Sequence, residues 1–394
     1  MATARPLAFG VDFFLQHARQ YQKEKIGFVT NDAAKTAQLQ SSRAAMMEAG
    51  LSIVRLFSPE HGLNAAGEDG SYQVHQIDKL TGLPVASLYG DKLQPDENDL
   101  KDIDVLVFDL PDAGCRFYTY QWTLSYIMEA CSRYNKPLIV LDRPNPISGI
   151  LSLAEGPMLD EMNCRSFIGR WNIPLRHSLT MGELAAYWNE TKAFHIDLTV
   201  MPVQGWSRNL FFDDLAVPFV PPSPGIPDFE TVLVYPGMGL LEGINVSEGR
   251  GTNSPFKICG APWINAEQFC TSLNNLQLPG FMASPVEFIP DANKYQHLKC
   301  LGARITITDK FIFRPVLAGL SLINLLMNLY PEKIEPHLYK TVANPSGENH
   351  LDKLTGINKS WNVLQQPVKH FQSVINHYTH ANNWTEKIKP FLLY

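Results

Sequence analysis

LSIVRLFSPEHG, residues 51–62, is the stretch that decides the fold. An apolar run rich in β-branched residues ends at Pro59 and is followed at once by Glu60 and His61, which is typical of a buried strand that runs into a loop. In an open α/β sheet the carboxyl ends of parallel strands face the ligand crevice. Glu60 and His61 are therefore candidate catalytic groups, although on this stretch alone Glu60 could equally cap a turn and His61 could bond to the backbone.

Other apolar runs surround this stretch along the first half of the chain. Strands are expected at residues 26–31, 83–90, 103–109, 137–142 and 196–203, and helices at residues 32–49, 121–134 and 180–189. Thr180 and Glu183 have the spacing of a capping box, which favours a helix that begins there. Because strands alternate with helices and are rich in β-branched residues, the pattern predicts an α/β fold with a doubly wound parallel sheet.

The second half of the chain is expected to form a smaller domain. VPFVPPSPGIP, residues 217–227, holds five prolines and is the best candidate for the boundary, so domains are predicted at residues 1–227 and 228–394. After an apolar segment at residues 231–235, the glycine-rich residues 236–255 are expected to form a binding loop. Helices are expected at residues 266–276, 315–330 and 361–378, and strands at residues 286–289 and 303–308. The weaker alternation here predicts an α+β domain.

The composition is that of an ordinary globular protein and disfavours several classes of function. A formal net charge of −6 without a basic cluster argues against nucleic acid as the main partner. No stretch approaches the ~18 apolar residues of a membrane span, and the first residues lack the pattern of a signal peptide. As written, the chain is therefore expected to be cytoplasmic, with a periplasmic or secreted protein as the alternative if its start is processed. The sequence does not indicate whether the protein is a monomer or an oligomer.

Cofactor and metal motifs do not occur in the sequence. No G-x-G-x-x-G follows the first strand, and neither G-x-x-x-x-G-K-[ST] nor G-x-S-x-G is found, which disfavours dinucleotide, ATP and serine-hydrolase sites. His61, His75 and His177 lack the H-x-x-x-H and H-E-x-x-H spacings of metal sites, whether combined with Asp109 or with Asp112. Six scattered cysteines form no C-x-x-C pair and are expected as free thiols in cores. We therefore expect no cofactor and no catalytic metal.

Polar side chains follow the predicted strands at the point where each strand ends. Because these ends share one edge of a parallel sheet, the side chains should converge. The candidates are Asn31, Glu60, His61, Asp112, Arg116, Tyr118, Arg143 and Asn145, to which we add His177. A carboxylic acid near apolar walls can protonate a leaving oxygen while a second carboxylate, or a neighbouring group of the substrate, stabilises the developing cation. That is the chemistry of a glycosidase.

Arginines and aromatic residues are further candidates for binding a sugar ligand. Four arginines suit either a carboxylate on the ligand or a structural ion pair: Arg116, Arg143, Arg176 and Arg250. Five aromatic residues could stack on sugars, although for each of them a place in the core is favoured: Tyr118, Tyr120, Trp122, Trp171 and Trp206.

Several long motifs resemble those of one known family. They include GFVTN at residues 27–31, FSPEHG at 57–62, DAGCRFYTY at 112–120, VLDRPNPISG at 140–149, PLRHSLTMGELA at 174–185 and EGINVSEGRGTNSPF at 242–256. In this order and over nearly the whole chain, the sequence resembles the exo-β-N-acetylmuramidases of bacterial cell-wall recycling.

The resemblance implies a Rossmann-like first domain, a smaller second domain and a cleft between them. It implies removal of terminal β-1,4-linked N-acetylmuramic acid from the non-reducing ends of peptidoglycan fragments. By position, Glu60 resembles the family's proposed catalytic acid.

A loop of the second domain resembles the family's cleft-lining segment; it contains Glu242, Asn245, Glu248 and Arg250. Our hypothesis is that His61 positions Glu60 and that Asp112 or Glu242 is the second carboxylate, unless the acetamido group of the substrate takes that part. The alternative is a non-catalytic binder of sugars derived from peptidoglycan.

Overall fold

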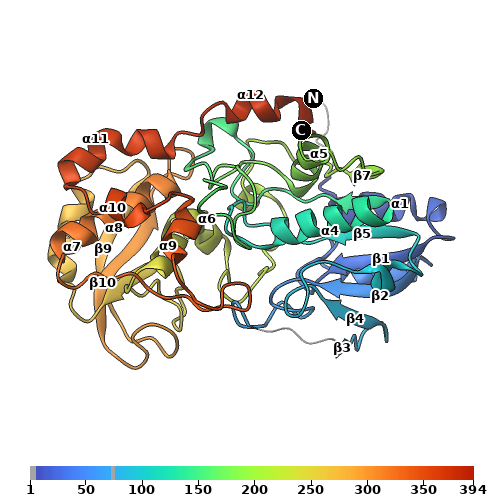
Figure 1. The fold of residues 1–394 in the computed structure, drawn as a ribbon, viewed down its shortest axis with the longest axis horizontal. Coiled ribbons are helices and arrows are strands. Elements are labelled where there is room, and N and C mark those ends of the chain that lie inside the picture. The colour runs from blue at the N-terminus through green and yellow to red at the C-terminus, as the bar shows by residue number, and fades with distance from the viewer. Residues whose placement is uncertain (1–5, 72–75) are drawn as a thin grey trace.

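The protein folds into two lobes that lie side by side (Figure 1). The computed structural model describes residues 6–71 and 76–394. A seven-stranded sheet forms the first lobe and a three-stranded sheet forms part of the second. Within the described residues, no helix combines the length and the apolar character needed to cross a membrane.

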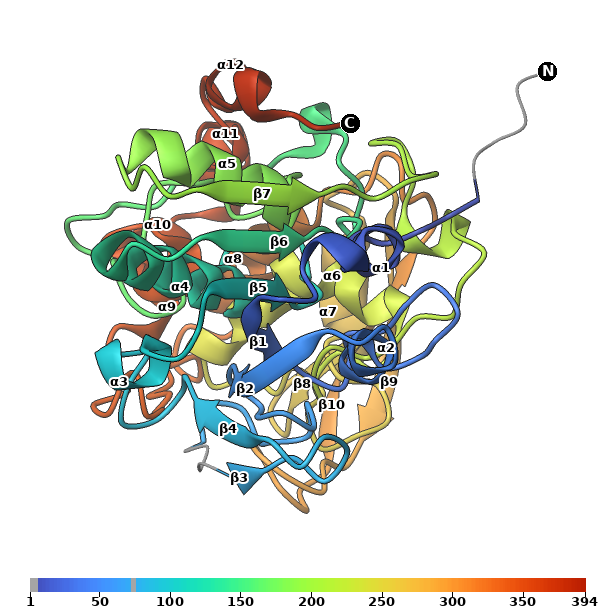
Figure 2. The same cartoon turned by 90° about the vertical axis from the view of Figure 1, so that its right-hand side faces the viewer.

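The sheet of the first lobe has the strand order β3-β4-β2-β1-β5-β6-β7, which Figure 2 shows stacked from bottom to top. Its strands are β1 (Lys25–Thr30), β2 (Ser52–Ser58), β3 (Gln76–Ile77), β4 (Pro84–Ser87), β5 (Val105–Asp109), β6 (Leu138–Leu141) and β7 (Leu198–Met201). All neighbouring pairs are parallel except β3 with β4. The parallel strands, counted along the chain, have the order 3-2-1-4-5-6 of a doubly wound Rossmann sheet, which confirms the predicted fold class.

Successive side chains of the central strands point to opposite faces of the sheet, and both faces are buried. Val105 and Val107 of β5 belong to the core that includes Val11 and Phe14 of α1. Leu106 of β5 and its neighbours on the same face belong to the core beneath α4 and α5. The helices of this lobe are α1 (Gly10–Gln16), α2 (Ser42–Glu48), α3 (Glu97–Leu100), α4 (Tyr120–Tyr134) and α5 (Met181–Thr191). Each face of the sheet therefore has its own helical cover, as a parallel sheet requires.

The start of α5 shows the capping box that the sequence predicts. The hydroxyl of Thr180 accepts a hydrogen bond from the backbone N–H of Glu183, and the Glu183 carboxylate accepts one from the backbone N–H of Thr180. This exchange satisfies two donors that the first turn of a helix leaves open. All six cysteines are free and buried, as expected.

The second lobe combines an antiparallel sheet, ordered β8-β10-β9, with a group of helices. Its strands are β8 (Ile258–Ala261), β9 (Phe281–Phe288) and β10 (Cys300–Ile307). Its helices are α6 (Phe229–Met238), α7 (Ala266–Asn274), α8 (Pro315–Leu329), α9 (His350–Thr355), α10 (Ser360–Leu364) and α11 (Val368–Thr379). This arrangement confirms the smaller α+β domain.

Three local predictions were wrong. Of the helix expected at residues 32–49, only the part from Ser42 to Glu48 is helical, and this part is α2. Residues 236–255 are not one loop, because α6 continues through Pro236 to Met238 and a 3-10 turn, Gly239–Gly243, follows it. The helix expected at residues 361–378 is divided into α10 and α11. Pro367 stands between them, and because it lacks a backbone N–H it cannot extend the helix that precedes it.

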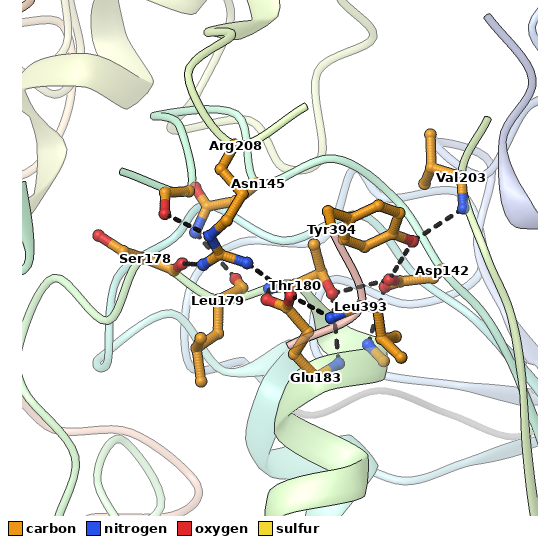
Figure 3. A network of polar contacts seen from close by, with 12 residues as sticks. Asp142, Asn145, Ser178, Leu179, Thr180, Glu183, Val203, Arg208, Leu393 and Tyr394 are labelled. Atoms are coloured by element: carbon orange, nitrogen blue, oxygen red, sulfur yellow. Dashed lines mark hydrogen bonds and ion pairs between the residues drawn. The ribbon is translucent and has the colours of Figure 1, made fainter. Parts of the chain in front are cut away.

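The end of the chain returns to the first lobe through α12 (Trp384–Ile388). Figure 3 shows Tyr394 beside Asp142, the residue after β6: its hydroxyl donates to the Asp142 carboxylate at 2.8 Å and accepts from the backbone N–H of Val203 at 2.8 Å. The backbone N–H of Leu393 donates to Glu183, whose carboxylate also accepts a hydrogen bond from Arg208. The last residues therefore pack on the first lobe although most of the preceding chain belongs to the second.

Candidate active site

A pocket of about 740 Å³ lies between the two lobes. The loop after β2 and the residues just before α4 line it from the first lobe, and residues 235–256 and 339–354 line it from the second. Five of the residues predicted from the sequence line this pocket: Glu60, His61, Tyr118, Glu242 and Arg250. The carboxyl edge of the parallel sheet and the predicted loop of the second lobe therefore face one space.

Glu60 is fixed by hydrogen bonds to both oxygens of its carboxylate. Oε1 accepts from the backbone N–H of Gly70 at 2.8 Å, and Oε2 accepts from the Thr119 hydroxyl at 2.7 Å. The hydroxyl of Tyr89 is also hydrogen-bonded to Glu60, and burial, followed by the charge of Glu60, raises the pKa of Tyr89 well above its ordinary value. With 7% of its surface exposed, Glu60 is held in one orientation at the pocket wall.

His61 lies beside Glu60 in a left-handed backbone conformation, with φ of 66°. Its Nδ1 lies 2.8 Å from the carbonyl oxygen of Gly67, and because a carbonyl can only accept, Nδ1 carries a proton. Nε2 lies 3.6 Å from a carboxylate oxygen of Asp69. The imidazole therefore orders the loop of residues 61–70 that supplies the N–H bonded to Glu60.

Arg250 gathers the carboxylates on the other side of the pocket. Its guanidinium forms an ion pair with Asp69, donates to Glu242 Oε1 at 2.8 and 3.1 Å, and lies 3.6 Å from Glu248. Burial raises the pKa of Glu242 to about 7, against the opposing influence of Arg250. Burial would also raise the pKa of Glu248, but Lys294, at 2.9 Å, and Arg250 outweigh it and lower that pKa. Of these two carboxyl groups, Glu242 therefore holds its proton to the higher pH.

Aromatic rings form one wall of the pocket. Tyr118 packs edge-on against Tyr120 and Tyr235, with ring centres 4.8 and 6.1 Å apart. Asn31 lies behind this wall and donates to the Tyr120 hydroxyl at 3.0 Å, and that hydroxyl donates to the carbonyl of Pro222. Asn31 therefore supports the wall without lining the pocket.

Asp112, His177 and Arg143 are grouped elsewhere. His177 Nε2 lies 3.2 Å from Asp112, and the Arg143 guanidinium binds both oxygens of Asp109 at 2.6 and 3.0 Å. Asp112 and Arg143 line a separate pocket of about 540 Å³ beside residues 217–222. Of the two candidates for the second carboxylate, Glu242 is the one that shares a pocket with Glu60.

Three further residues predicted from the sequence, Arg116, Asn145 and Asn245, form hydrogen bonds to backbone groups instead of lining the pocket. Arg116 is fully buried and donates to the carbonyl groups of Pro157, Ile173, Leu354 and Thr355, and burial lowers its pKa to about 10. Asn145 bonds to the backbone of Ile147 and Leu179, and Asn245 to that of Lys333 and Glu335. These three side chains fix neighbouring loops and do not line the pocket.

Sequence reasoning missed the pocket residues of the second lobe beyond residue 256. Tyr339, His350 and Lys353 line the pocket, but they lie in turns and a short helix that have no strand-end pattern. Asp69 and Gly70 lie in the glycine-rich residues 62–82, which the sequence predicts as a candidate binding loop because they are too many for a simple turn. Within the described residues, no three histidine, cysteine or acidic side chains are grouped as metal ligands, and His75 lies outside those residues.

Comparisons with known proteins agree on one family. The model for the N-terminal part of exo-beta-N-acetylmuramidase NamZ matches residues 26–230, and the model for its C-terminal part matches residues 233–394. The peptidoglycan beta-N-acetylmuramidase NamZ of Bacillus subtilis (strain 168) is 42% identical over 328 residues, which are 83% of this chain and 78% of that protein.

Two crystal structures of DUF1343 family proteins from Bacteroides fragilis NCTC 9343 share the fold. One has a TM-score of 0.87 at 29% identity and covers 100% of both chains. The other has a TM-score of 0.72 at 23% identity and covers 98% of this chain and 99% of its own. Together with the two matched models and the identity to the Bacillus protein, these observations show that the chain belongs to the NamZ exo-β-N-acetylmuramidase family.

Proposed function

We propose that this protein is an exo-β-N-acetylmuramidase that releases terminal β-1,4-linked N-acetylmuramic acid from the non-reducing ends of peptidoglycan fragments. The observation that carries the proposal is the pairing of Glu60, in the family's SPEHG motif, with Glu242 across one pocket between the lobes.

Glu60 acts as the general acid in this proposal. Its proton passes to the glycosidic oxygen as the bond from that oxygen to the anomeric carbon breaks, so the leaving sugar departs as a neutral alcohol. The groups around Glu60 permit both of its protonation states. The hydroxyls of Thr119 and Tyr89 donate to the carboxylate but can rotate and accept when Glu60 carries the proton.

Glu242 is the second carboxylate. The carbonyl oxygen of the substrate's 2-acetamido group attacks the anomeric carbon, and Glu242 takes the amide proton as the ring of this intermediate closes. A base that titrates near neutral pH performs such a transfer best, and the pKa of Glu242 is about 7. Water then opens the intermediate, with Glu60 accepting a proton from the water and Glu242 returning the proton to the amide.

A chromogenic assay tests this function. The substrates are aryl β-glycosides of N-acetylmuramic acid and of N-acetylglucosamine, which differ only in the lactyl ether. We expect the enzyme to release chromophore from the muramic compound with clear preference. Binding of both sugars by calorimetry without release of chromophore from either would instead identify a sugar-binding protein.

A further inference from the structure

The lactyl ether of N-acetylmuramic acid brings a carboxylate into a pocket that is already acidic. Glu60, Asp69 and Glu242 all line the pocket, so an anionic substrate needs a cation there that these groups do not neutralise. The following inference rests on the proposed function, because it concerns how the same pocket would select this sugar.

The arginines predicted for this task already have partners. Arg116 and Arg176 donate to backbone carbonyls, and Arg143 binds both oxygens of Asp109. Arg250 lines the pocket but is surrounded by the carboxylates of Asp69, Glu242 and Glu248. Arg116, Arg143 and Arg176 do not line this pocket, and Arg250, which does, is already paired with carboxylates.

Lys353 of α9 is a cation of the pocket with a different environment. Its ammonium donates to Asn344 Oδ1 at 2.7 Å and to the carbonyl oxygen of Glu348 at 3.0 Å. Both acceptors are uncharged, and within residues 6–71 and 76–394 no carboxylate oxygen lies within 4.0 Å of the Lys353 ammonium. Since an ammonium has three donors, one N–H remains. Burial lowers the pKa of Lys353 against the smaller, opposing influence of the Glu348 charge, and a bound anion would offset the loss of hydration.

His350 adds an unsatisfied polar atom on the same face of α9. It precedes Lys353 by three residues, a spacing that places both side chains on one side of a helix. Only 6% of His350 is exposed, and its Nε2 has no hydrogen-bond partner in the part of the chain that the structure describes. The ring stacks on Tyr339 with centres 4.5 Å apart, and burial lowers its pKa to about 3, so it is neutral at ordinary pH.

The segment that contains these residues is joined to the Glu60 loop. The Tyr89 hydroxyl is hydrogen-bonded to both Glu60 and Thr341. The backbone N–H of Val342 donates to the carbonyl of Gly70 at 3.0 Å, and the N–H of Gly70 donates to Glu60. The wall formed by residues 339–354 is therefore held in register with the proposed catalytic acid.

We propose that Lys353, with His350 beside it, forms an anion subsite that binds the lactyl carboxylate and so selects N-acetylmuramic acid over N-acetylglucosamine. Lys353 supplies the charge and its remaining N–H, and neutral His350 supplies an N–H from Nε2. The contact lies on a substituent away from the bond that is cleaved. It is therefore expected to act more on KM than on kcat.

A substrate pair separates this role from a merely structural one. Aryl β-glycosides of N-acetylmuramic acid and of its lactyl amide are compared on the wild type, Lys353→Met, Lys353→Arg and Lys369→Met. Lys369 is exposed on α11 of the same lobe and controls for the loss of one charge. The wild type should prefer the acid by about ten- to hundredfold, the usual range for a hydrogen bond to a charged group.

Lys353→Met should reduce that preference to near one, mainly by raising KM for the acid. Lys353→Arg should restore part of it, and Lys369→Met should match the wild type. An unchanged preference in Lys353→Met, or an equal loss on both substrates, would overturn the subsite. Calorimetric titration with free N-acetylmuramic acid and its amide gives the same comparison without turnover, so the subsite can be judged even if no glycoside is cleaved.

Discussion

Arg250 of the second lobe forms an ion pair with Asp69 of the first, and the other oxygen of Asp69 lies 3.6 Å from His61. This carboxylate therefore connects the loop that holds Glu60 to the cluster that holds Glu242. The shape of the pocket depends on this contact between lobes as well as on the two folds.

Replacing Arg250 with methionine should destabilise the protein and weaken substrate binding. The substitution leaves Asp69 and Glu242 without their shared cation, whereas Glu248 keeps its ion pair with Lys294; an uncompensated buried charge costs about 3–5 kcal/mol. We expect a lower melting temperature and a higher KM, with Arg165→Met, at an exposed position, as the control. Adding Glu242→Gln to Arg250→Met should recover part of the stability, since it removes one of the stranded carboxylates; strictly additive losses would contradict this account.

The rate should depend on the ionisation of Glu242. Its pKa of about 7 in the folded protein lies above the ordinary 4.5, so the group is protonated below neutral pH and ionised above it. Because the proposed base must be ionised while Glu60 carries its proton, the ionisation of Glu242 should produce a bend near pH 7 in the plot of log kcat/KM against pH. The rate rises through this bend if Glu60 keeps its proton there and falls if Glu60 has already lost it, and Glu242→Gln should lose the bend in either case. A bend near pH 7 that persists in Glu242→Gln would contradict the assignment to Glu242.

Gly70→Ala should reduce activity more than its effect on stability explains. Gly70 has φ of 66°, and a Cβ there would lie 2.4 Å from the Thr341 side chain, so the N–H that bonds Glu60 must move. Gly82 has nearly the same φ, 70°, with no atom within 4 Å of a Cβ. Gly82→Ala therefore reproduces the backbone strain, about 1–2 kcal/mol, and should keep wild-type kinetics. Equal kinetics in both variants would show that the Gly70 contact is not needed.

Tyr394→Phe should destabilise the first lobe, because it leaves the Val203 N–H unsatisfied and removes a donor from buried Asp142 (Figure 3). The loss should be about 1–3 kcal/mol. Burial raises the pKa of Asp142 to about 6, so the donor matters most above that pH, where Asp142 is ionised. Denaturant unfolding should show a larger loss at pH 8 than at pH 5. Tyr21→Phe, which keeps the ring that packs on Phe14, serves as the control, and an equal loss at both pH values would refute the assignment to Asp142.

The strands of the first lobe could be predicted from the sequence because their apolar runs are short and end in polar residues. The same rule brought Glu60 and His61 to the pocket, since both follow β2 directly. The strand-end rule could not tell which polar residues pair with each other. Arg143 also follows a strand, but its guanidinium forms an ion pair with Asp109. That pairing depends on strand order, which a single strand does not reveal.

The second lobe was less predictable for a different reason. The apolar segment before Pro236 lies in a helix and its residues 231–235 are all buried. A segment that is apolar on every side has no periodicity that distinguishes a buried helix from a buried strand. Lys353 and His350 reach the pocket only because residues 339–354 fold back against Gly70. By contrast, Pro367 was a readable break in the predicted helix at 361–378.

The most direct test of the account is release of free N-acetylmuramic acid from the β-1,4-linked disaccharide of N-acetylmuramic acid and N-acetylglucosamine. Wild type, Glu60→Gln and Glu97→Gln would be compared by chromatography of the products, with folding checked by thermal melts. Glutamine keeps an oxygen for the Gly70 N–H, and exposed Glu97 controls for the change itself. We predict that wild type and Glu97→Gln release N-acetylmuramic acid and that Glu60→Gln, still folded, is slower by a factor on the order of 10² or more. Near-normal release by Glu60→Gln, or no release by the wild type, would contradict the account.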